Sequence, residues 1–498
     1  MAISNPGPGH SGTAGSLNSV AASVKATLSS NYIDFTATAT AGWAQQYLPD
    51  LMEKEAEVFG NRTISGFLAQ VGAEEAMTSD QVVWSEQGRL HLSYIGAINN
   101  TTGVFTVSTD IDGNTVASGA HGIRINDMCI VATAEGTIKC LCTAAAATTA
   151  TLLPYEQANI DDATAFGTGA TEACTVLVIG SEFGKGKQGQ GASASSTAGF
   201  GNTEPSFKSF TNKPIIIKDY FEVSGSDASA IGWIEISGED GQNGYLWYLK
   251  AEGDTRSRFT DYLEMTMLEA VAGVPGNSTA EGTIGTAGDN FGTEGLFAAI
   301  ETRGNITTGI TGVNAATDLA EFDAILAEFD SQGAIEENMM FVNRATSLAM
   351  DDMLASMNSY GAGGTSYGVF NNSEDMALNL GFSGFRRGSY DFYKSDFRYL
   401  NDKATRGGIN DIAGSAAIRG VIIPAGVSSV YDQQLGKNLK RPFLHVRYRA
   451  SQTDDRRMKT WVTGSVGAAT SALDAMQLHF LTERCLITQG ANNFMLLK

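Results

Sequence analysis

The chain has 498 residues, a formal net charge of −21 at pH 7 and only 17% charged residues, against 57 glycines. A chain of this length holds two to four domains, and its 43% hydrophobic content is typical of a globular protein with a core. The negative charge excludes a dedicated nucleic-acid binder, which needs a basic surface to neutralise phosphates. It allows a protein that lies close to DNA without adhering to it.

The five cysteines, Cys129, Cys140, Cys142, Cys174 and Cys485, form no Cys-x-x-Cys pair and are odd in number. This pattern predicts free, buried thiols in a reducing compartment. The first residues have neither the basic nor the apolar region of a secretory signal, and no apolar run is long enough to cross a bilayer. We therefore expect a protein made in the cytoplasm, with no membrane segment.

The first 183 residues divide into three regions of different composition and periodicity. Residues 1–35 are rich in Gly, Ser, Ala and Asn, which predicts an extended arm that a partner would order. Residues 43–71 carry apolar side chains at helical spacing, and residues 82–95 alternate as a strand does. From 97 to 183, short strand-like runs are separated by turns, which predicts an inserted all-β barrel or sandwich.

A long helix is predicted over residues 244–271, a stretch without proline whose second half repeats apolar residues at helical spacing. Its middle is charged: Glu252 precedes Arg256, and Asp254 precedes Arg258, each by the four residues that favour an ion pair on a helix surface. At 1.5 Å per residue the helix would be about 40 Å long. Such a helix lies along a surface or bridges regions more readily than it fits inside one compact core.

Helical and strand patterns alternate in the rest of the chain, which predicts an α/β or α+β domain. The periodicity predicts strands at 214–223, 231–237, 338–342, 418–423, 443–450 and 485–488, and helices at 316–329, 343–357 and 472–484.

Two short motifs match known chemistry but lack its context. Residues 184–189 fit the GxGxxG pattern, yet no helix follows to hold a pyrophosphate. Residues 364–368 fit the GxSxG nucleophile pattern, with Ser366 as nucleophile and His445 or His479 as base, but a Gly-rich loop stands where the elbow needs a strand. The cysteines lack the spacing of zinc ligands. We therefore expect no catalytic site, no cofactor and no metal.

A basic run at 440–459 carries seven of the 33 cations of the chain. Three explanations are open: a solvated strand face, an electrostatic contact with an acidic face of another copy, and, more weakly, contact with DNA. The residues expected at such a contact are Arg441, Arg447, Arg449, Arg456 and Arg457, with Arg386 and Arg387 and the charged helix residues Glu252, Asp254, Arg256 and Arg258.

The order of elements, together with the lack of a catalytic constellation, resembles the major capsid proteins of tailed bacteriophages, which share the Hong Kong ninety-seven fold. The closing stretch 480–497, FLTERCLITQGANNFMLL, is similar to the ending of several phage capsid sequences. Large insertions such as 97–183 occur in that family, including among crAss-like and marine phages.

The resemblance implies an α+β fold with an N-terminal arm, an extended hairpin called the E-loop, a spine helix, peripheral and axial domains, and the inserted all-β domain. The expected divisions are an arm at 1–81, E-loop limbs at 82–96 and 184–225, the inserted domain at 97–183, a peripheral domain at 226–295, 380–410 and 440–470 with the spine at 244–271, and an axial domain at 296–379, 411–439 and 471–498.

The resemblance also implies a function. The chain would be a structural subunit that self-assembles into hexamers and pentamers of an icosahedral phage head, and would enclose double-stranded DNA without sequence-specific binding. Its partners would be further copies, portal, scaffolding and decoration proteins, and it would be found in the virion capsid after assembly in the host bacterial cytoplasm. The alternatives are another virion structural protein, such as a tail or sheath subunit, and a serine hydrolase using Ser366.

Overall fold

A computed structural model describes residues 67–68, 73–89, 92–160, 170–185, 207–226, 236–237, 243–244, 246–273, 277–279, 282–284, 291–333, 335–358, 384–425, 427–432, 437–466 and 469–498. The chain divides into two compact units, Met1–Arg62 with Gly232–Leu246, and Thr63–Ile231 with Trp247–Lys498. In the first unit, β11 (Ile236–Ser237) pairs antiparallel with β12 (Asn243–Gly244). The elements below belong to the second unit, apart from the first residue of helix α4 (Leu246–Glu269).

A five-stranded mixed sheet joins segments that are far apart in the sequence. Its strands are β1 (Ala73–Met77), β10 (Ile215–Ser224), β22 (Leu444–Arg449), β23 (Lys459–Gly464) and β24 (Ala475–Thr488). The order is β1-β22-β24-β10, with β23 also paired to β24. β1 runs parallel to β22, whereas β24 is antiparallel to each of its three neighbours. The 14 residues of β24 therefore hold the sheet together.

The prediction of a helix over 472–484 is wrong, because this stretch belongs to β24. From Phe480 to Thr488 every residue of the strand is buried. A strand covered on both faces loses the two-residue alternation that would identify it, so its pattern resembles that of a buried helix. Its pairing also places 475–488 in the five-stranded sheet, not in the axial part expected for 471–498.

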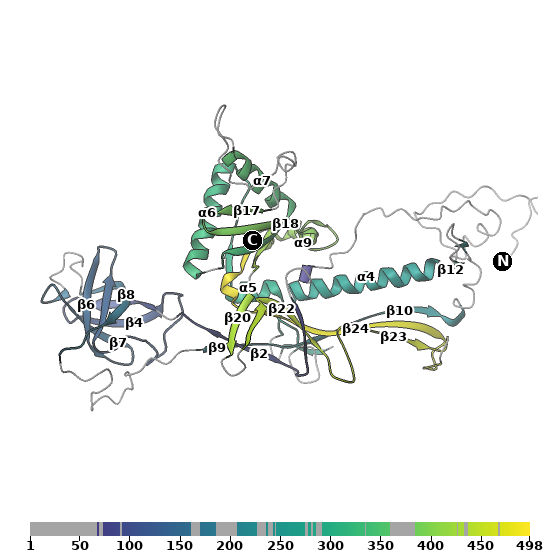
Figure 1. Ribbon diagram of the computed structural model, residues 1–498, viewed down its shortest axis with the longest axis horizontal. Helices are drawn as coiled ribbons and strands as arrows, with labels where there is room; N and C mark the ends of the chain where they lie inside the picture. The colour runs from purple at the N-terminus through teal and green to yellow at the C-terminus, as the bar shows by residue number, and fades with distance from the viewer. Residues whose placement is uncertain are drawn as a thin grey trace, which may run out of the picture. The chain divides into compact units, whose positions relative to one another are not determined.

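The helix predicted over 244–271 is observed as α4. Figure 1 shows it lying along β10, β24 and β23. The apolar stripe of α4 buries Phe259 and Leu263 against Leu478 and Phe480 of β24, and the rings of Phe259 and Phe480 are 5.7 Å apart. The helical spacing seen in the sequence thus identifies the side of α4 that packs on the sheet.

A second, six-stranded sheet has its own helices. Its strands are β15 (Asn305–Thr307), β16 (Glu337–Val342), β17 (Gly384–Arg387), β18 (Tyr390–Asp396), β19 (Gly420–Pro424) and β25 (Met495–Leu497), in the order β15-β25-β19-β16-β18-β17. Its helices are α5 (Leu296–Arg303), α6 (Ala315–Gln332), α7 (Arg344–Asn358), α8 (Arg398–Asn401) and α9 (Arg406–Ala413), of which α6 and α7 are the longest. Phe322 of α6, Met350 of α7 and Phe392 of β18 share one core cluster.

The stretches 380–410 and 440–470, expected in one domain, supply strands to different sheets. β18 pairs parallel with β16, and β17 pairs with β18, so both belong to the six-stranded sheet. Phe385 and Phe392 lie 5.5 and 5.2 Å from the ring of Phe322. The aromatic, basic texture of this stretch indicates strands but carries no information about which sheet they join.

A two-stranded ribbon is formed by β2 (Val82–Gln87) and β9 (Phe207–Asn212), which pair antiparallel from Val82↔Asn212 to Gln87↔Phe207. Residues 88–206 are therefore connected to the chain at one end of this ribbon. The second limb expected at 184–225 ends at Asn212, because β10 pairs with β24 in the five-stranded sheet. The single strand predicted over 82–95 is two, since a break separates β2 from the next strand.

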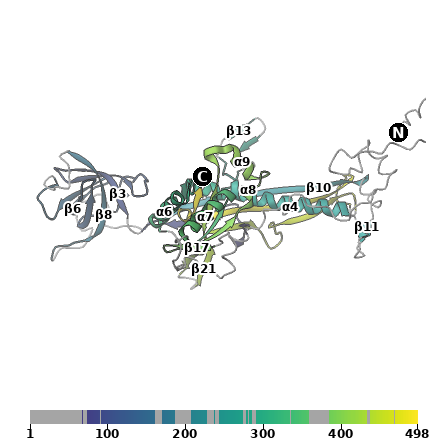
Figure 2. The same ribbon diagram turned by 90° about the horizontal axis from the view of Figure 1, so that it is seen from above.

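The inserted segment contains a closed barrel, drawn from two directions in Figures 1 and 2. Its strands are β3 (Ser93–Asn99), β4 (Val104–Asp110), β5 (Asp127–Ala132), β6 (Thr137–Ala145), β7 (Thr149–Pro154) and β8 (Thr171–Ser181), in the closed order β3-β4-β7-β6-β5-β8. All pairings are antiparallel. Alternate residues such as Phe105, Val131, Leu152 and Val176 fill the interior.

Two hairpins complete the described strands. They are β13 (Asn277–Thr279) with β14 (Gly282–Ile284), and β20 (Val427–Asp432) with β21 (Lys437–Pro442). Of the helical stretch predicted at 43–71, the structure describes Phe67 and Leu68, which are helical and buried. Most of that stretch, the Gly-rich loop from 186 and the motif at 364–368 lie outside the described residues. Within the described part of the chain, no helix is long and apolar enough to cross a membrane.

Candidate functional site

The part of the basic run from Arg447 to Arg457 lies at the β1 side of the five-stranded sheet and faces carboxylates of its own chain. Arg447 of β22 pairs with Glu75 of β1 at 2.7 Å. Arg449 pairs with Asp80 and, at 3.2 Å, with Glu483 of β24. These contacts follow from the parallel register, which places Glu75 opposite Arg447.

Glu74 is the centre of a second group of charges. Its carboxylate pairs with Arg457 and, at 3.3 Å, with Arg484 of β24. The side chain of Arg484 is only 7% exposed, and burial lowers the pKa of its guanidinium while the charge of Glu74 opposes that shift. Arg456 pairs with Glu483 at 3.0 Å and closes the cluster. A buried guanidinium needs such partners, because an unpaired charge in the interior is costly.

The described arginines of this run therefore pair with carboxylates of their own chain, and contact with another subunit stays a prediction. Two of these carboxylates, Glu74 and Glu75, belong to a five-residue strand that sequence analysis placed in the N-terminal arm. The only feature of the sequence that marks these carboxylates is the acidic segment AEEAM at 73–77. No local pattern connects this segment with the basic run nearly 400 residues later. We call Glu74, Glu75, Glu483 and their arginine partners the edge-strand cluster.

The other charged candidates also have partners within the chain. Arg387 donates two hydrogen bonds to Asp323 of α6, at 2.6 and 2.8 Å, and Arg386 lies 3.6 Å from Asp391. The side chain of Arg441 lies outside the described part. Both Arg387 and Arg386 therefore attach β17 to neighbouring elements of its own sheet.

The charged middle of α4 is divided between two roles. Arg256 pairs with Glu252 at 3.4 Å, as the helix spacing predicts. Arg258 does not pair with Asp254 but donates two hydrogen bonds to Asp219 of β10, at 2.9 and 3.1 Å. Asp254 is exposed. One side of the helix middle thus binds the sheet, and the other faces outward.

The base of the β2–β9 ribbon is tied to both sheets by polar contacts. The side-chain amide of Asn212 donates to the carbonyl of Leu486 at 2.6 Å and to that of Glu294 at 3.0 Å. Arg303 of α5 pairs with Glu294 at 2.6 Å and lies 4.5 Å over the ring of Phe210. Burial raises the pKa of the Glu294 carboxyl, against the lowering effect of Arg303.

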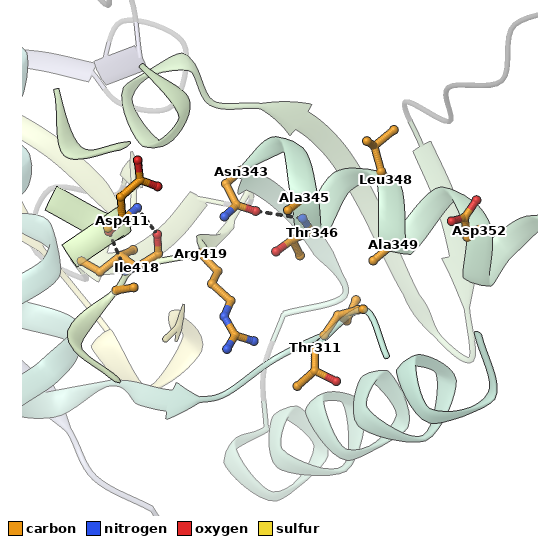
Figure 3. A pocket seen from close by; sticks show the side chains of 14 residues that line it. Thr311, Asn343, Ala345, Thr346, Leu348, Ala349, Asp352, Asp411, Ile418 and Arg419 are labelled. Carbon is orange, nitrogen blue, oxygen red and sulfur yellow. Dashed lines mark hydrogen bonds between the residues drawn. The ribbon is translucent and has the colours of Figure 1, made fainter. Parts of the chain in front are cut away.

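An open hollow of about 480 Å³ lies between α7, α9 and the loop before α6 (Figure 3). Asn343 at its wall accepts a hydrogen bond from the backbone N–H of Thr346 at 2.8 Å and so begins α7. Thr311 is held by Glu321, and Asn410 bonds both backbone groups of Ile418. The polar groups that line the hollow therefore serve helix ends and loops. They include no Ser, Cys or His.

Of the residues proposed for hydrolysis, the structure describes the two candidate bases. Ser366 lies outside the described residues. His445 is buried, with Nδ1 3.3 Å from the carbonyl of Pro442, and His479 Nε2 lies 2.7 Å from Thr463 Oγ1.

The thiols have no reactive or metal-binding arrangement. All five are buried and free, and burial raises the pKa of each, to about 12 for Cys140, Cys142, Cys174 and Cys485. Among the described residues no group of three or more His, Cys, Asp or Glu side chains could hold a metal ion.

The chain was compared with known proteins. No family model matches it, and no curated protein does. A solved structure titled Mycobacterium phage Ogopogo is 9% identical and matches 92% of this chain and 97% of its own, with a TM-score of 0.39. One titled Microbacterium phage Oxtober96 is 9% identical over 94% and 99%, with a TM-score of 0.36. A third, titled as the capsid of an empty GTA particle, is 11% identical over 93% and 98%, with a TM-score of 0.32. At these TM-scores none of the three establishes a shared fold.

Proposed function

We propose that the chain is the major capsid protein of a tailed bacteriophage. It assembles with its own copies into hexamers and pentamers of an icosahedral shell around double-stranded DNA. The observation that carries the proposal is the order of elements: a ribbon with a large insertion at its end, a long helix on one sheet, and a second sheet with separate helices. This is the order that the resemblance implies for an E-loop, a spine, a peripheral domain and an axial domain.

In this proposal the β2–β9 ribbon is the E-loop, and the barrel is the domain inserted in it. α4 is the spine, and the five-stranded sheet is the peripheral layer. The six-stranded sheet with α5, α6 and α7 is the axial domain, which includes β17 and β18 and excludes β24.

The chemistry of the described residues supports a structural role. The hollow beside α7 has no nucleophile paired with a base, and the thiols are protonated at neutral pH because burial raises their pKa. A shell subunit needs surfaces that match those of its copies, not a reactive pocket. The net charge of −21 limits adhesion to the enclosed DNA.

The outward side of the α4 middle is the contact surface with another copy in this proposal. Exposed Asp254 is the first candidate there, with the ion pair of Glu252 and Arg256 beside it, whereas Arg447 and Arg457 of the basic run pair within the chain. Portal, scaffolding and decoration proteins are further partners of a shell subunit, and its location is the virion after assembly in the host cytoplasm.

Expression of the full chain, alone and with a scaffolding protein, tests the proposal. Sedimentation and negative-stain microscopy should show closed shells with fivefold and sixfold capsomers. Open tubes would instead favour a tail or sheath subunit. A folded chain that stays monomeric under all assembly conditions would contradict the proposal.

A further inference from the structure

One part of the outer wall of the barrel is apolar. In a small barrel, residues alternate between the interior and the exterior along every strand, and the exterior positions are ordinarily polar. On β8, Leu177 and Ile179 are nevertheless 39% and 48% exposed, and on β7 Leu153 is 50% exposed. These side chains alternate with interior residues such as Leu152 and Val176.

The register of the strands places these residues side by side. Leu177 of β8 lies opposite Ile130 of β5. Met128 of β5 lies opposite Leu141 of β6, which lies opposite Leu153 of β7. Apolar residues therefore lie on four neighbouring strands, and the exposed Lys139 of β6, opposite Ile130, lies among them. We call this surface the apolar wall: Met128, Ile130, Leu141, Leu153, Leu177 and Ile179.

The rest of the exterior shows that an apolar surface is not general to this barrel. On β4, exposed Thr106 and Ser108 alternate with buried Phe105 and Val107. Thr106 lies opposite Thr149 of β7, whose side chain is also on the outside. Ile95 of β3 is also 36% exposed, so the apolar exterior is concentrated on the wall but not confined to it. An apolar area gathered in this way on an exposed surface is typical of an interaction site.

The charge of the barrel selects the kind of partner. Its described residues, 93–160 and 170–183, hold two cations and seven acidic residues, a net charge of −5. Beside the wall, Tyr155 donates a hydrogen bond to Glu182 at 2.6 Å. Two copies of this wall would carry charge of the same sign, which opposes their association. A basic surface would be attracted.

The closed barrel also limits how a partner binds. Because every strand is paired on both sides, a peptide cannot add to it as a further strand. Contact must be made through side chains, as when the apolar face of an amphipathic helix lies on a hydrophobic surface. We propose that the apolar wall docks a basic partner polypeptide that presents an apolar helix face. This goes beyond the proposed function, since a shell subunit binds its own acidic copies and this partner is a different chain.

The test measures binding of the full-length chain to a fluorescently labelled synthetic helix of Leu and Lys with one apolar face. Binding is measured by fluorescence anisotropy at physiological salt. Leu153→Glu and Ile179→Glu should each weaken binding about tenfold or more. Thr106→Glu and Ser108→Glu, on the exposed face of β4, add the same charge away from the wall and should leave binding equal or slightly tighter. A matching helix of Leu and Glu should not bind.

Equal binding by wall and control variants would overturn the proposal, because it would show attraction by charge alone. Failure of the Leu/Lys helix to bind would also overturn the proposal. Self-association of the chain in sedimentation that Leu153→Glu removes would overturn it too, because the occupant of the wall would then be a second copy. If a Glu variant does not fold, by circular dichroism and thermal melting, Leu153→Ser and Ile179→Thr test the same contact without charge. Particle formation is measured separately, so failure of docking and failure of the capsid function are distinguishable.

Discussion

Glu74 and Arg484 are 410 positions apart in the sequence, yet a carboxylate oxygen of Glu74 lies 3.3 Å from Nη1 of Arg484. The contact attaches the short strand β1 to the centre of the five-stranded sheet. Because Arg484 is buried and Arg457 shares the same carboxylate, the edge-strand cluster contributes to the stability of the folded chain.

Glu74→Gln should lower the free energy of unfolding by about 2 kcal/mol, since it removes the ion-pair partner of the buried Arg484 guanidinium, while the charge of Glu264 and the partial solvation of Glu74 limit the loss. Asp254→Asn, at an exposed carboxylate on α4, is the matched control and should change stability by less than about 0.5 kcal/mol. Urea denaturation followed by circular dichroism measures both. Equal values for the two variants would show that the cluster adds nothing.

Reversal of Arg447 to Glu should destabilise the chain itself, because it places two carboxylates beside each other at Glu75. Adding Glu75→Arg should recover part of the loss, with a coupling energy of about 1 kcal/mol. A double-mutant cycle in urea measures the coupling. If Arg447→Glu instead leaves stability unchanged and blocks only assembly, Arg447 contacts another copy after all.

Phe259→Ala should cost about 3–5 kcal/mol, because it removes a fully buried ring that packs on Phe480. Tyr262 lies three residues later on the same helix and is 42% exposed. Tyr262→Ala should therefore cost less than about 1 kcal/mol of the free energy of unfolding. Thermal melting of the two variants compares them. Similar losses would mean that α4 does not pack on the sheet by this stripe.

The stability of the fold should fall at high pH. Burial raises the pKa of Cys174 and Cys485 from an ordinary value of 9.0 to about 12, so these thiols favour the folded state below pH 9. Their contribution is lost as the pH rises from 9 through 12, because the unfolded chain releases those protons first. Urea midpoints should therefore decrease over this range, and less steeply in Cys485→Ala.

A thiol reagent at pH 8 should label the cysteines only after unfolding, and rapid labelling of the native chain would contradict their burial.

Asp254→Lys should block shell assembly without changing the fold, if the outward side of α4 contacts another copy. Glu135→Lys, on an exposed hairpin of the barrel, makes the same change of charge away from that side and should assemble normally. Sedimentation measures assembly, and circular dichroism checks the fold. Normal particles from Asp254→Lys would remove α4 from the list of contacts.

Local periodicity was sufficient for many of the elements. The spacing of Phe259, Leu263 and Met267 predicted α4 because a helix repeats its buried side every three to four residues, and all three side chains are buried. The short runs from 97 to 183 likewise predicted strands in a small barrel or sandwich. Local periodicity could not indicate that the six strands close into a barrel, or that one part of its outer wall is apolar. Both features depend on the register between strands.

The sequence by itself determined the helix α4, most strands, the lack of a catalytic pattern and the strongly acidic character of the chain, because each depends on neighbouring residues or on composition. Only the tertiary structure decided where the strands belong. Phe480–Thr488 was mistaken for helix and short strand because burial on both faces removes the alternation that marks a strand. The pairing of the basic run within the chain could not be predicted, because its partners Glu74 and Glu75 lie nearly 400 residues earlier. A pairing at that separation is fixed by strand register and by the cost of burying an unpaired charge, neither of which has a local signature.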